Sequence, residues 1–266
     1  MTGERALLSV QHLCRNFGGL AAVADVSFDV RQGEFVGIIG PNGAGKTTLL
    51  NLITGYLKPS EGKIQFQSKS IEGLRPCRIN RLKIGRTFQV VQPFNEMTVA
   101  ENVMVGAKFG QGAWRSSSDI EGDVSMALEL SGLSASANVL AESLTLGEKK
   151  RLELARSVAS RPTLLLLDEV MGGLSVGEIR TLVESLKCIH TSGVTIIMIE
   201  HVLHALFQLV GRVLVLDFGR KIADGNPTEV MSHPDVVSSY LGRPLHQDEA
   251  LYLGSHNPET QRVDRR

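Results

Sequence analysis

Short, continuous hydrophobic runs recur along this chain and predict strands that are buried on both faces. They occupy Phe35–Ile39, Thr163–Leu167, Val194–Ile199 and Val213–Leu216. Two other segments, Val26–Val30 and Lys63–Gln67, alternate apolar and polar residues. A period of two predicts half-buried strands. The second of these segments lies among turn formers and indicates an antiparallel region.

Apolar residues at three-to-four spacing predict helices between these strands. The pattern covers residues 46–54, 99–105, 123–131, 149–158, 177–189 and 202–209. Strands and helices alternate in the last third of the chain, so we expect a parallel sheet. The middle third is helical, so we expect a helical insertion there. The polar tail over residues 244–266 has no hydrophobic face, and we expect it to be mobile.

The composition is that of a folded protein. The 266 residues are 42% hydrophobic and 21% charged, which leaves little room for wholesale disorder. At about 150 residues per domain, the length leaves the count open between one and two. The 28 Lys and Arg residues balance the 28 Asp and Glu residues. No overall charge therefore favours nucleic acid or an anionic membrane as a partner.

The sequence contains no predicted membrane span or secretory signal. Its apolar stretches are far shorter than the ~20 residues that cross a bilayer. Its start lacks the apolar core and cleavage site of a signal peptide. Cys14, Cys77 and Cys188 are odd in number and far apart, which predicts neither a disulfide framework nor a metal-ligand pair. We therefore expect a soluble or peripheral protein of the cytosol.

A glycine-rich segment between a predicted strand and a predicted helix carries the strongest chemical signal. It fits G-x-x-x-x-G-K-[ST], and this context is the one that confirms a phosphate-binding P-loop. Glycines let backbone N–H groups face phosphate oxygens, the lysine reaches the β- and γ-phosphates, and the hydroxyl ligates Mg²⁺. We predict that ATP binds to Gly40, Pro41, Asn42, Gly43, Ala44, Gly45, Lys46, Thr47 and Thr48, with Thr47 on the metal.

Two carboxylates end the leucine run that follows Thr163. The carboxyl end of a parallel strand lies at the same sheet edge as the P-loop, so we predict that Asp168 holds magnesium. Glu169 is then placed to polarise the water that attacks the γ-phosphate. Alone, this segment would be a strand that runs into a solvated turn. Together with the P-loop, it favours hydrolysis.

The segment Leu144–Arg156 resembles the LSGGQ-type signature of ABC ATPases. Thr145 and Gly147 offer a hydroxyl and a backbone N–H at a predicted helix start, an anion site without its own lysine, which suggests a shared ligand. In that family the signature crosses a dimer interface to the partner's nucleotide. The resemblance thus implies that Thr145, Gly147 and Glu148 contact ATP. Alone, the segment would be a capped amphipathic helix with a solvated basic turn.

Three more positions match this family. Gln89 matches the glutamine that touches magnesium and water, and His201 matches the switch histidine at the γ-phosphate. Both are implied catalytic residues, with Gln89 also a metal ligand, although a lone Gln or His is more often structural. Phe17 matches the aromatic residue that stacks on adenine, and a core phenylalanine is the alternative.

The resemblance extends over about residues 7–243 and is most detailed for one branch, the LivG-type ATP-binding subunits of branched-chain amino acid uptake systems. The matching stretches are Phe17–Val23, Gly40–Thr48, Arg86–Gln89, Met97–Val103, Glu200–His201 and Pro234–Gly242. It implies an α/β P-loop NTPase of the ABC ATPase type, with a RecA-like core, an antiparallel β subdomain and an inserted α-helical subdomain over about residues 90–160. The whole would form one domain over residues 1–243.

The resemblance also implies a function. The chain would be the ATP-hydrolysing subunit of an ABC importer at the cytoplasmic face of the inner membrane. It would serve branched-chain amino acids or small solutes such as urea or amides. A second ABC ATPase subunit, identical or different, would share two Mg-ATP with it. Permease subunits and, indirectly, a solute-binding protein would complete the system. The alternatives are the ATPase of an exporter or lipopolysaccharide-transport system, or a soluble P-loop NTPase. None of these residues touches the solute, so the sequence does not identify it.

The chain departs from the family pattern at four positions. Thr145 stands for the usual Ser, Glu148 for Gln, Val170 for Pro, and Ser175 for the Asp or Asn of the D-loop. Thr145 keeps a hydroxyl. Glu148 places a carboxylate near an incoming triphosphate, which predicts a change in efficiency rather than loss of activity.

A basic run precedes Gln89, at Arg75, Arg78, Arg81, Lys83 and Arg86. It lacks interleaved aromatic residues and the chain as a whole is neutral, which argues against nucleic acid. We predict a solvated face.

Overall fold

The structure is a computed structural model that describes residues 6–110 and 116–241. Its strands are β1 (Leu8–Phe17), β2 (Leu20–Val30), β3 (Phe35–Ile39), β4 (Glu61–Phe66), β5 (Lys69–Ser70), β6 (Ile84–Arg86), β7 (Leu164–Asp168), β8 (Thr195–Ile199), β9 (Arg212–Asp217) and β10 (Arg220–Gly225). Its helices are α1 (Lys46–Ile53), α2 (Pro76–Arg81), α3 (Val99–Gly110), α4 (Ser117–Leu130), α5 (Leu146–Val158), α6 (Val176–Thr191), α7 (Leu203–Leu206), α8 (Pro227–Met231) and α9 (Pro234–Leu241). Within the described ranges, no helix is long and apolar enough to cross a membrane.

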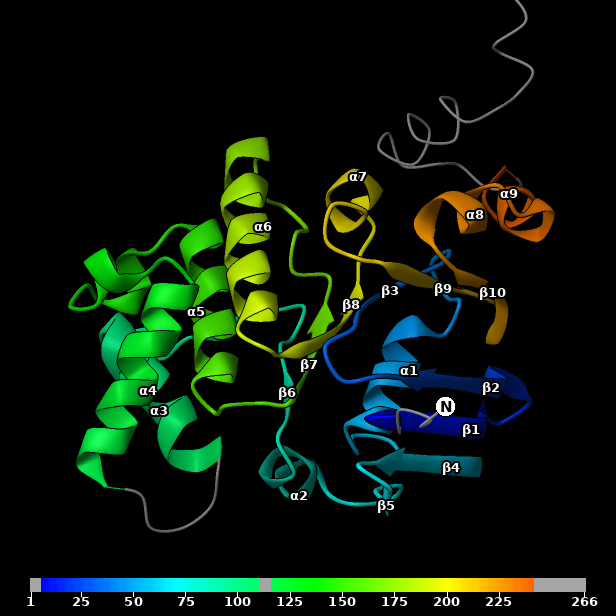
Figure 1. The fold of residues 1–266 in the computed structure, drawn as a ribbon, viewed down its shortest axis with the longest axis horizontal. Helices are drawn as coiled ribbons and strands as arrows, with labels where there is room; N and C mark the ends of the chain where they lie inside the picture. The colour runs from blue at the N-terminus through cyan, green and yellow to red at the C-terminus, as the bar shows by residue number, and fades with distance from the viewer. Residues whose placement is uncertain (1–5, 111–115, 242–266) are drawn as a thin grey trace, which may run out of the picture.

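The strands form two sheets (Figure 1). The larger has the order β10-β9-β3-β8-β7-β6, and its strands run parallel from β9 to β6. Every residue of β3, β7 and β8 is buried, as the continuous apolar runs predicted for a sheet covered on both faces. The smaller sheet, β2-β1-β4-β5, is antiparallel. The predicted parallel core and antiparallel region are both present.

Alternate residues of the large sheet enter two separate cores. In β3, Val36 and Ile38 join a cluster that contains Leu49 and Leu50 of α1 and the inner face of the small sheet. Helix α1 is therefore packed between the two sheets (Figure 1). Side chains on the other face of the strand, such as Ile39, pack against the helices that cover that face of the sheet. This arrangement fixes α1, and the P-loop before it, at the carboxyl end of β3.

Helices α3, α4 and α5 lie side by side at one end of the molecule, and α6 joins them to the sheet (Figure 1). These are the helices predicted for the middle of the chain. Their buried faces merge with the core above the large sheet. The domain limits at residues 1–243 remain a prediction, and the predicted mobile tail at residues 244–266 lies outside the described residues.

The basic run before Gln89 is only partly the solvated face that its charges predict. Arg75, Arg78, Arg81 and Lys83 are exposed, around the short helix α2. The prediction is wrong for Arg86, whose side chain is 7% exposed. Arg86 ends β6, a short strand that pairs with β7, so its side chain points into the protein at the carboxyl edge of the sheet.

Candidate nucleotide site

The P-loop connects β3 to α1 and closes on its own backbone. Lys46 is 5% exposed, and its Nζ donates hydrogen bonds to the carbonyl oxygens of Gly40 at 2.6 Å and Pro41 at 3.0 Å. Gly45 has φ +96°, and an added Cβ would lie 2.2 Å from the carbonyl oxygen of Ala22. Only glycine fits such a left-handed, crowded position without strain. The loop thus packs against Ala22 of β2, and the lysine side chain is hydrogen-bonded to the first residues of the loop.

A cleft of about 520 Å³ opens in front of this loop. It is lined by Asn42, Gly43, Ala44, Gly45, Lys46, Thr47, Thr48, Glu169, Leu20, Ala21, Ala22, Ala24, Phe218 and Arg220. The N-terminus of α1 and the cationic Lys46 and Arg220 give the cleft positive potential, while the residues of β2 make one wall apolar. One end therefore suits a polyphosphate and the other an apolar or aromatic group.

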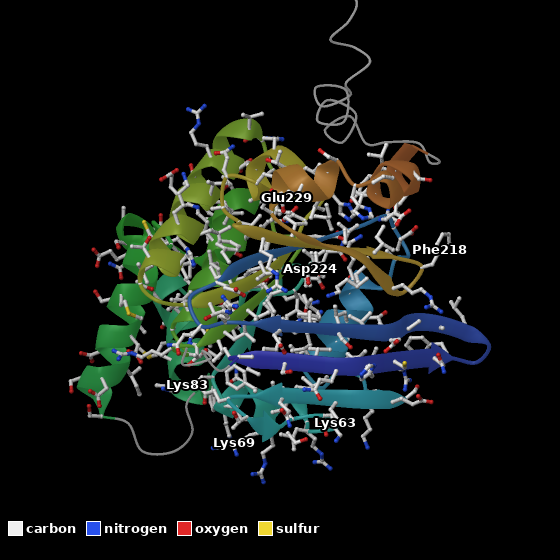
Figure 2. The ribbon with its side chains drawn as sticks, turned by 45° about the vertical axis from the view of Figure 1, so that its right-hand side comes forward. Lys63, Lys69, Lys83, Phe218, Asp224 and Glu229 are labelled. Atoms are coloured by element: carbon white, nitrogen blue, oxygen red, sulfur yellow. The ribbon has the colours of Figure 1, made fainter. Side chains whose placement is uncertain are left out.

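The predicted adenine contact, Phe17, is not among the residues that line this cleft. Phe17 is 45% exposed, and the Arg15 guanidinium covers one face of its ring, 4.6 Å from the ring centre. Phe218 does line the cleft, from the turn between β9 and β10 (Figure 2). Sequence reasoning did not find Phe218, because an aromatic residue in a hairpin turn carries no pattern of its own.

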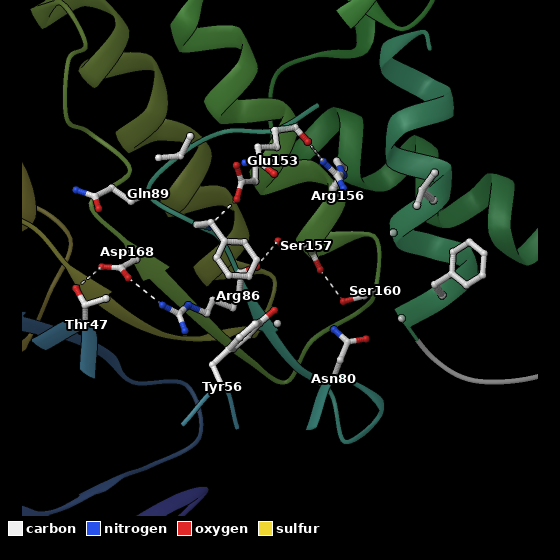
Figure 3. A pocket seen from close by; sticks show the side chains of 18 residues that line it. Thr47, Tyr56, Asn80, Arg86, Gln89, Glu153, Arg156, Ser157, Ser160 and Asp168 are labelled. Carbon is white, nitrogen blue, oxygen red and sulfur yellow. Dashed lines mark hydrogen bonds and ion pairs between the residues drawn. The ribbon is translucent and has the colours of Figure 1, made fainter. Parts of the chain in front are cut away.

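Asp168 and Thr47 meet at the carboxyl edge of the large sheet, as predicted. Thr47 Oγ1 lies 3.5 Å from Asp168 Oδ1 (Figure 3). Asp168 is 2% exposed, and burial raises the pKa of its carboxyl, while the Arg86 guanidinium opposes that rise. Arg86 Nη2 donates to Asp168 Oδ2 at 3.0 Å. The arginine is a partner of this carboxylate that the sequence pattern did not reveal.

The donor set at this edge fits magnesium. A hydroxyl and a carboxylate oxygen lie side by side, and Mg²⁺ is held in such sites by one or two protein oxygens together with phosphate oxygens and water. Within the described ranges, no group of three or more His, Cys, Asp or Glu side chains could hold a metal ion. With Thr47 and Asp168 as protein ligands, the ion would complete its coordination with phosphate oxygens and water.

Glu169 is the centre of a second set of contacts. Gln89 Nε2 donates to Glu169 Oε2 at 2.6 Å, and His201 Nε2 lies 3.0 Å from Glu169 Oε1. The residue has φ +51°, a left-handed conformation that is uncommon and costly outside glycine and is found at functional sites. Its side chain lines the cleft in front of the P-loop. The structure thus brings together Gln89, Glu169 and His201 from three segments that are far apart in the sequence.

A buried acid and a buried base lie behind Glu169. Glu200 is 2% exposed and accepts hydrogen bonds from the backbone N–H groups of Met171 at 2.7 Å and His201 at 3.2 Å. Burial raises its pKa to about 7, against the attraction of Lys150. Lys150, on α5, donates to the carbonyl oxygen of Glu169 at 3.3 Å. In the sequence, Glu200 stands out only as the neighbour of His201 in a stretch that matches the family, and residue spacing does not predict its contacts with Met171 and Lys150.

The signature segment (Leu144–Arg156) starts helix α5. Thr145 is the N-cap, its hydroxyl accepts the N–H of Glu148, and the Glu148 carboxylate accepts the N–H of Thr145. Thr145, Gly147 and Glu148 do not line the cleft that holds the P-loop of this chain. That this incomplete anion site serves a ligand held elsewhere stays a prediction.

Comparison with known proteins gives two family matches. The family model described as "ABC transporter" matches residues 23–172, which include the P-loop and both carboxylates. The model described as "Branched-chain amino acid ATP-binding cassette transporter" matches residues 220–246.

Curated relatives match nearly from end to end. The high-affinity branched-chain amino acid transport ATP-binding protein LivG of Salmonella typhimurium (strain LT2) is 38% identical over 254 residues, which are 90% of this chain and 99% of the relative. LivG of Escherichia coli (strain K12) is 37% identical over the same shares. The corresponding protein BraF of Pseudomonas aeruginosa is 36% identical, again over 90% of this chain and 99% of the relative.

Solved structures confirm the predicted fold class. A nucleotide-free ATP-binding cassette from an ABC transporter superimposes with a TM-score of 0.81 at 31% identity, over 90% of this chain and 100% of that chain. The ADP conformation of such a cassette gives a TM-score of 0.81 at 32% identity over the same shares. Both neighbours therefore share the fold described above over nearly their whole length.

Proposed function

This chain belongs to the ABC transporter family as an ATP-binding, ATP-hydrolysing subunit, and on that premise we propose that it powers an importer of branched-chain amino acids or related small solutes such as urea or amides. The relatives named for branched-chain amino acid transport support this solute class. The observation that carries the catalytic assignment is the position of Glu169. Both of its oxygens are held, by Gln89 and His201, at the mouth of the P-loop cleft.

Each residue then has a separate task. The backbone of the P-loop, Lys46 and the N-terminus of α1 bind the phosphates. Thr47, Asp168 and Gln89 would hold Mg²⁺, which neutralises charge on the β- and γ-phosphate oxygens when bound. The Glu169 carboxylate orients a water and accepts its proton as the water oxygen bonds to the γ-phosphorus. The bond from that phosphorus to the bridging oxygen breaks, and ADP and phosphate leave.

Two subunits share the work in this proposal. The signature segment, which does not line the cleft of its own chain, contacts the nucleotide bound to a second ABC ATPase subunit, identical or different. ATP binding closes the pair and hydrolysis reopens it. Permease subunits convert this movement into transport, with a solute-binding protein as the indirect partner. The pair would lie at the cytoplasmic face of the inner membrane, attached as a peripheral component.

The first test is the mass of purified Glu169→Gln protein with and without Mg-ATP, measured by light scattering after gel filtration. Removal of the carboxylate blocks hydrolysis and traps an ATP-bound pair. We expect twice the chain mass of 28.8 kDa with Mg-ATP and the single mass without it. The double variant Glu169→Gln, Lys46→Ala is the matched control and should stay single, because it lacks the phosphate-binding amine.

A Glu169→Gln protein that binds ATP and yet stays single would refute pairing with a second copy of this chain. Addition of a different ATPase subunit that restores the double mass would then identify the partner. The solute is tested separately, by purification of the native membrane complex and measurement of leucine and urea binding to its solute-binding protein. Binding of neither would contradict the proposed solute class while leaving the ATPase assignment intact.

A further inference from the structure

Arg86 is a buried cation beside the proposed metal site. It is the last residue of β6, which pairs with β7 next to the two catalytic carboxylates. Its side chain is 7% exposed, and that of Asp168 is 3% exposed. A guanidinium does not lose its proton in a protein, so this charge must be compensated where it lies.

The guanidinium joins two elements that carry the proposed metal ligands. Nη2 donates to Asp168 Oδ2 at 3.0 Å, on the strand side. Nη1 donates to Asn51 Oδ1 at 2.7 Å and to Thr54 Oγ1 at 2.9 Å, both at the C-terminal end of the α1 region. Thr47 lies in the first turn of that same helix. Arg86 therefore ties the helix that carries Thr47 to the strand that carries Asp168. Figure 3 shows its contact with Asp168.

The contact with Asp168 engages only one of its oxygens. Arginine and carboxylate often pair through two parallel hydrogen bonds, which would occupy both. Here the second nitrogen is taken by α1, and Asp168 Oδ1 faces Thr47 Oγ1 at 3.5 Å. The carboxylate is therefore held in one rotation, with Oδ2 on the arginine and Oδ1 on the side of Thr47.

The surroundings keep the guanidinium in place. Its central carbon lies 5.6 Å from the ring centre of Tyr56 and 5.3 Å from that of Phe88, within the range of cation–π attraction. Ser157 Oγ donates to the backbone oxygen of Arg86 at 3.2 Å, a contact with the main chain and not with the guanidinium. A lysine has no planar fork and could not reach Asp168 and both acceptors on α1 in the same way.

We propose that Arg86 is a positioning residue for magnesium, which holds Asp168 and α1 so that Asp168 Oδ1 and Thr47 Oγ1 together face the ion of Mg-ATP. The inference rests on the proposed function, because it takes Mg-ATP as the ligand. Arg86 itself touches neither the nucleotide nor the ion. Groups that orient a metal ligand in this way change metal affinity by about 10- to 100-fold when they are removed.

The test compares ATP affinity of the full chain with Mg²⁺ and with EDTA, by titration with a fluorescent ATP analogue. In Arg86→Met we expect affinity in EDTA to stay within about twofold of wild type. The increase in ATP affinity that Mg²⁺ produces should fall by about tenfold or more. The Mg²⁺ concentration for half-maximal hydrolysis should rise by a similar factor. Ser157→Ala is the matched control, because it removes a contact with the Arg86 backbone and leaves the guanidinium contacts in place. It should behave as wild type.

Because removal of one partner of a buried ion pair is destabilising, Arg86→Lys provides a second variant that keeps the charge. It should fold and show a smaller rise in the Mg²⁺ requirement, about threefold or more. Wild-type Mg²⁺ dependence in either folded variant would overturn the proposal, and so would equal losses of affinity in Mg²⁺ and EDTA. If the wild-type protein hydrolyses ATP but gains no ATP affinity from Mg²⁺, this inference fails and the proposed function stands. If the wild-type protein neither binds nor hydrolyses ATP, the proposed function fails and this inference fails with it.

Discussion

Glu200→Gln should make the stability of this protein respond differently to pH. Glu200 is 2% exposed, and burial raises the pKa of its carboxyl from an ordinary 4.5 to about 7. The positive charge of Lys150 lowers this pKa, and the negative charge of Glu169 raises it further. In the unfolded chain the same carboxyl ionises near 4.5. Between these two values the folded protein binds a proton more tightly than the unfolded chain. The free energy of unfolding that Glu200 contributes therefore falls as pH rises through this window and is level above it.

The size of the effect follows from the interval between the two pKa values. From 4.5 to about 7 is an interval of about 2.5, and each unit corresponds to about 1.4 kcal/mol, so the loss amounts to about 3 kcal/mol. Glutamine has the same shape and does not titrate. The N–H groups of Met171 and His201 donate to different oxygens of Glu200, so the single glutamine oxygen keeps one of these hydrogen bonds, and the loss of the other does not vary with pH. The difference in unfolding free energy, variant minus wild type, should therefore rise by about 3 kcal/mol between pH 4.5 and pH 8.

Urea denaturation of the nucleotide-free protein at pH 4.5, 5.5, 6.5, 7.5 and 8 measures this difference directly. Groups that do not interact with Glu200 titrate alike in the two proteins, so their contributions cancel in the subtraction. A difference that is independent of pH would refute the reasoning, since it would mean that Glu200 ionises in the folded protein as it does in water. A difference that falls with rising pH would show that Lys150 stabilises the carboxylate more than burial penalises it.

Gly45→Ala should abolish ATP binding in a calorimetric titration, because an added Cβ would lie 2.2 Å from a backbone oxygen at φ +96°. Gly43→Ala, with φ +81° and no atom within 4 Å of the added Cβ, should bind more weakly than wild type but not lose binding. Thr145→Ala removes the N-cap of α5 and should lower the free energy of urea unfolding by about 1 kcal/mol, while Thr145→Ser should restore it. Stacking of adenine on Phe17, as the family resemblance implies, predicts that Phe17→Ala weakens ATP binding by about fivefold and leaves binding of inorganic triphosphate unaffected, as stacking worth about 1 kcal/mol requires. The same loss in Phe218→Ala, with Phe17→Ala as wild type, would instead assign the adenine contact to the turn between β9 and β10, whose Phe218 lines the cleft.

The strands that sequence reasoning predicted are those whose burial is decided locally. A run such as Leu164–Leu167 is apolar on both faces, and no partner is needed to recognise it. Strand β1 was not predicted, because its alternation breaks where the register shifts between Val10 and Leu13, and His12 there has φ +49°. Strand β10 is mostly polar and pairs with β9, with an ion pair from Arg212 to Asp224 that no local pattern shows.

In the site too, residues that follow a local sequence pattern were predicted, and residues whose partners are distant in the sequence were not. The P-loop and the two acids at the end of β7, Asp168 and Glu169, were predicted because strand, loop and helix follow one another in the chain. Arg86 was assigned to a solvated face because its charged neighbours precede it by a few residues. Its real partners are Asp168, Asn51 and Thr54, which are 82, 35 and 32 residues away. Contacts of this kind depend on sheet order, which places β6 beside β7, and this order is not visible in residue spacing.

Helix capping accounts for two of the departures from the family pattern. Glu148 stands where Gln is usual, and its carboxylate accepts the N–H of Thr145, so it completes the N-terminal box of α5. Ser175 stands where Asp or Asn is usual, and it forms the same box with Glu178 at the start of α6. Serine, aspartate and asparagine all serve as N-caps, so this exchange keeps the helix start. The Glu148 carboxylate is hydrogen-bonded to the N–H of Thr145 at the N-terminus of α5. This is the end of the helix where a partner's triphosphate is proposed to bind. Neutral glutamine would keep that hydrogen bond and remove the repulsion. In the proposed pair, we therefore predict that the charge of Glu148 weakens closure without loosening α5.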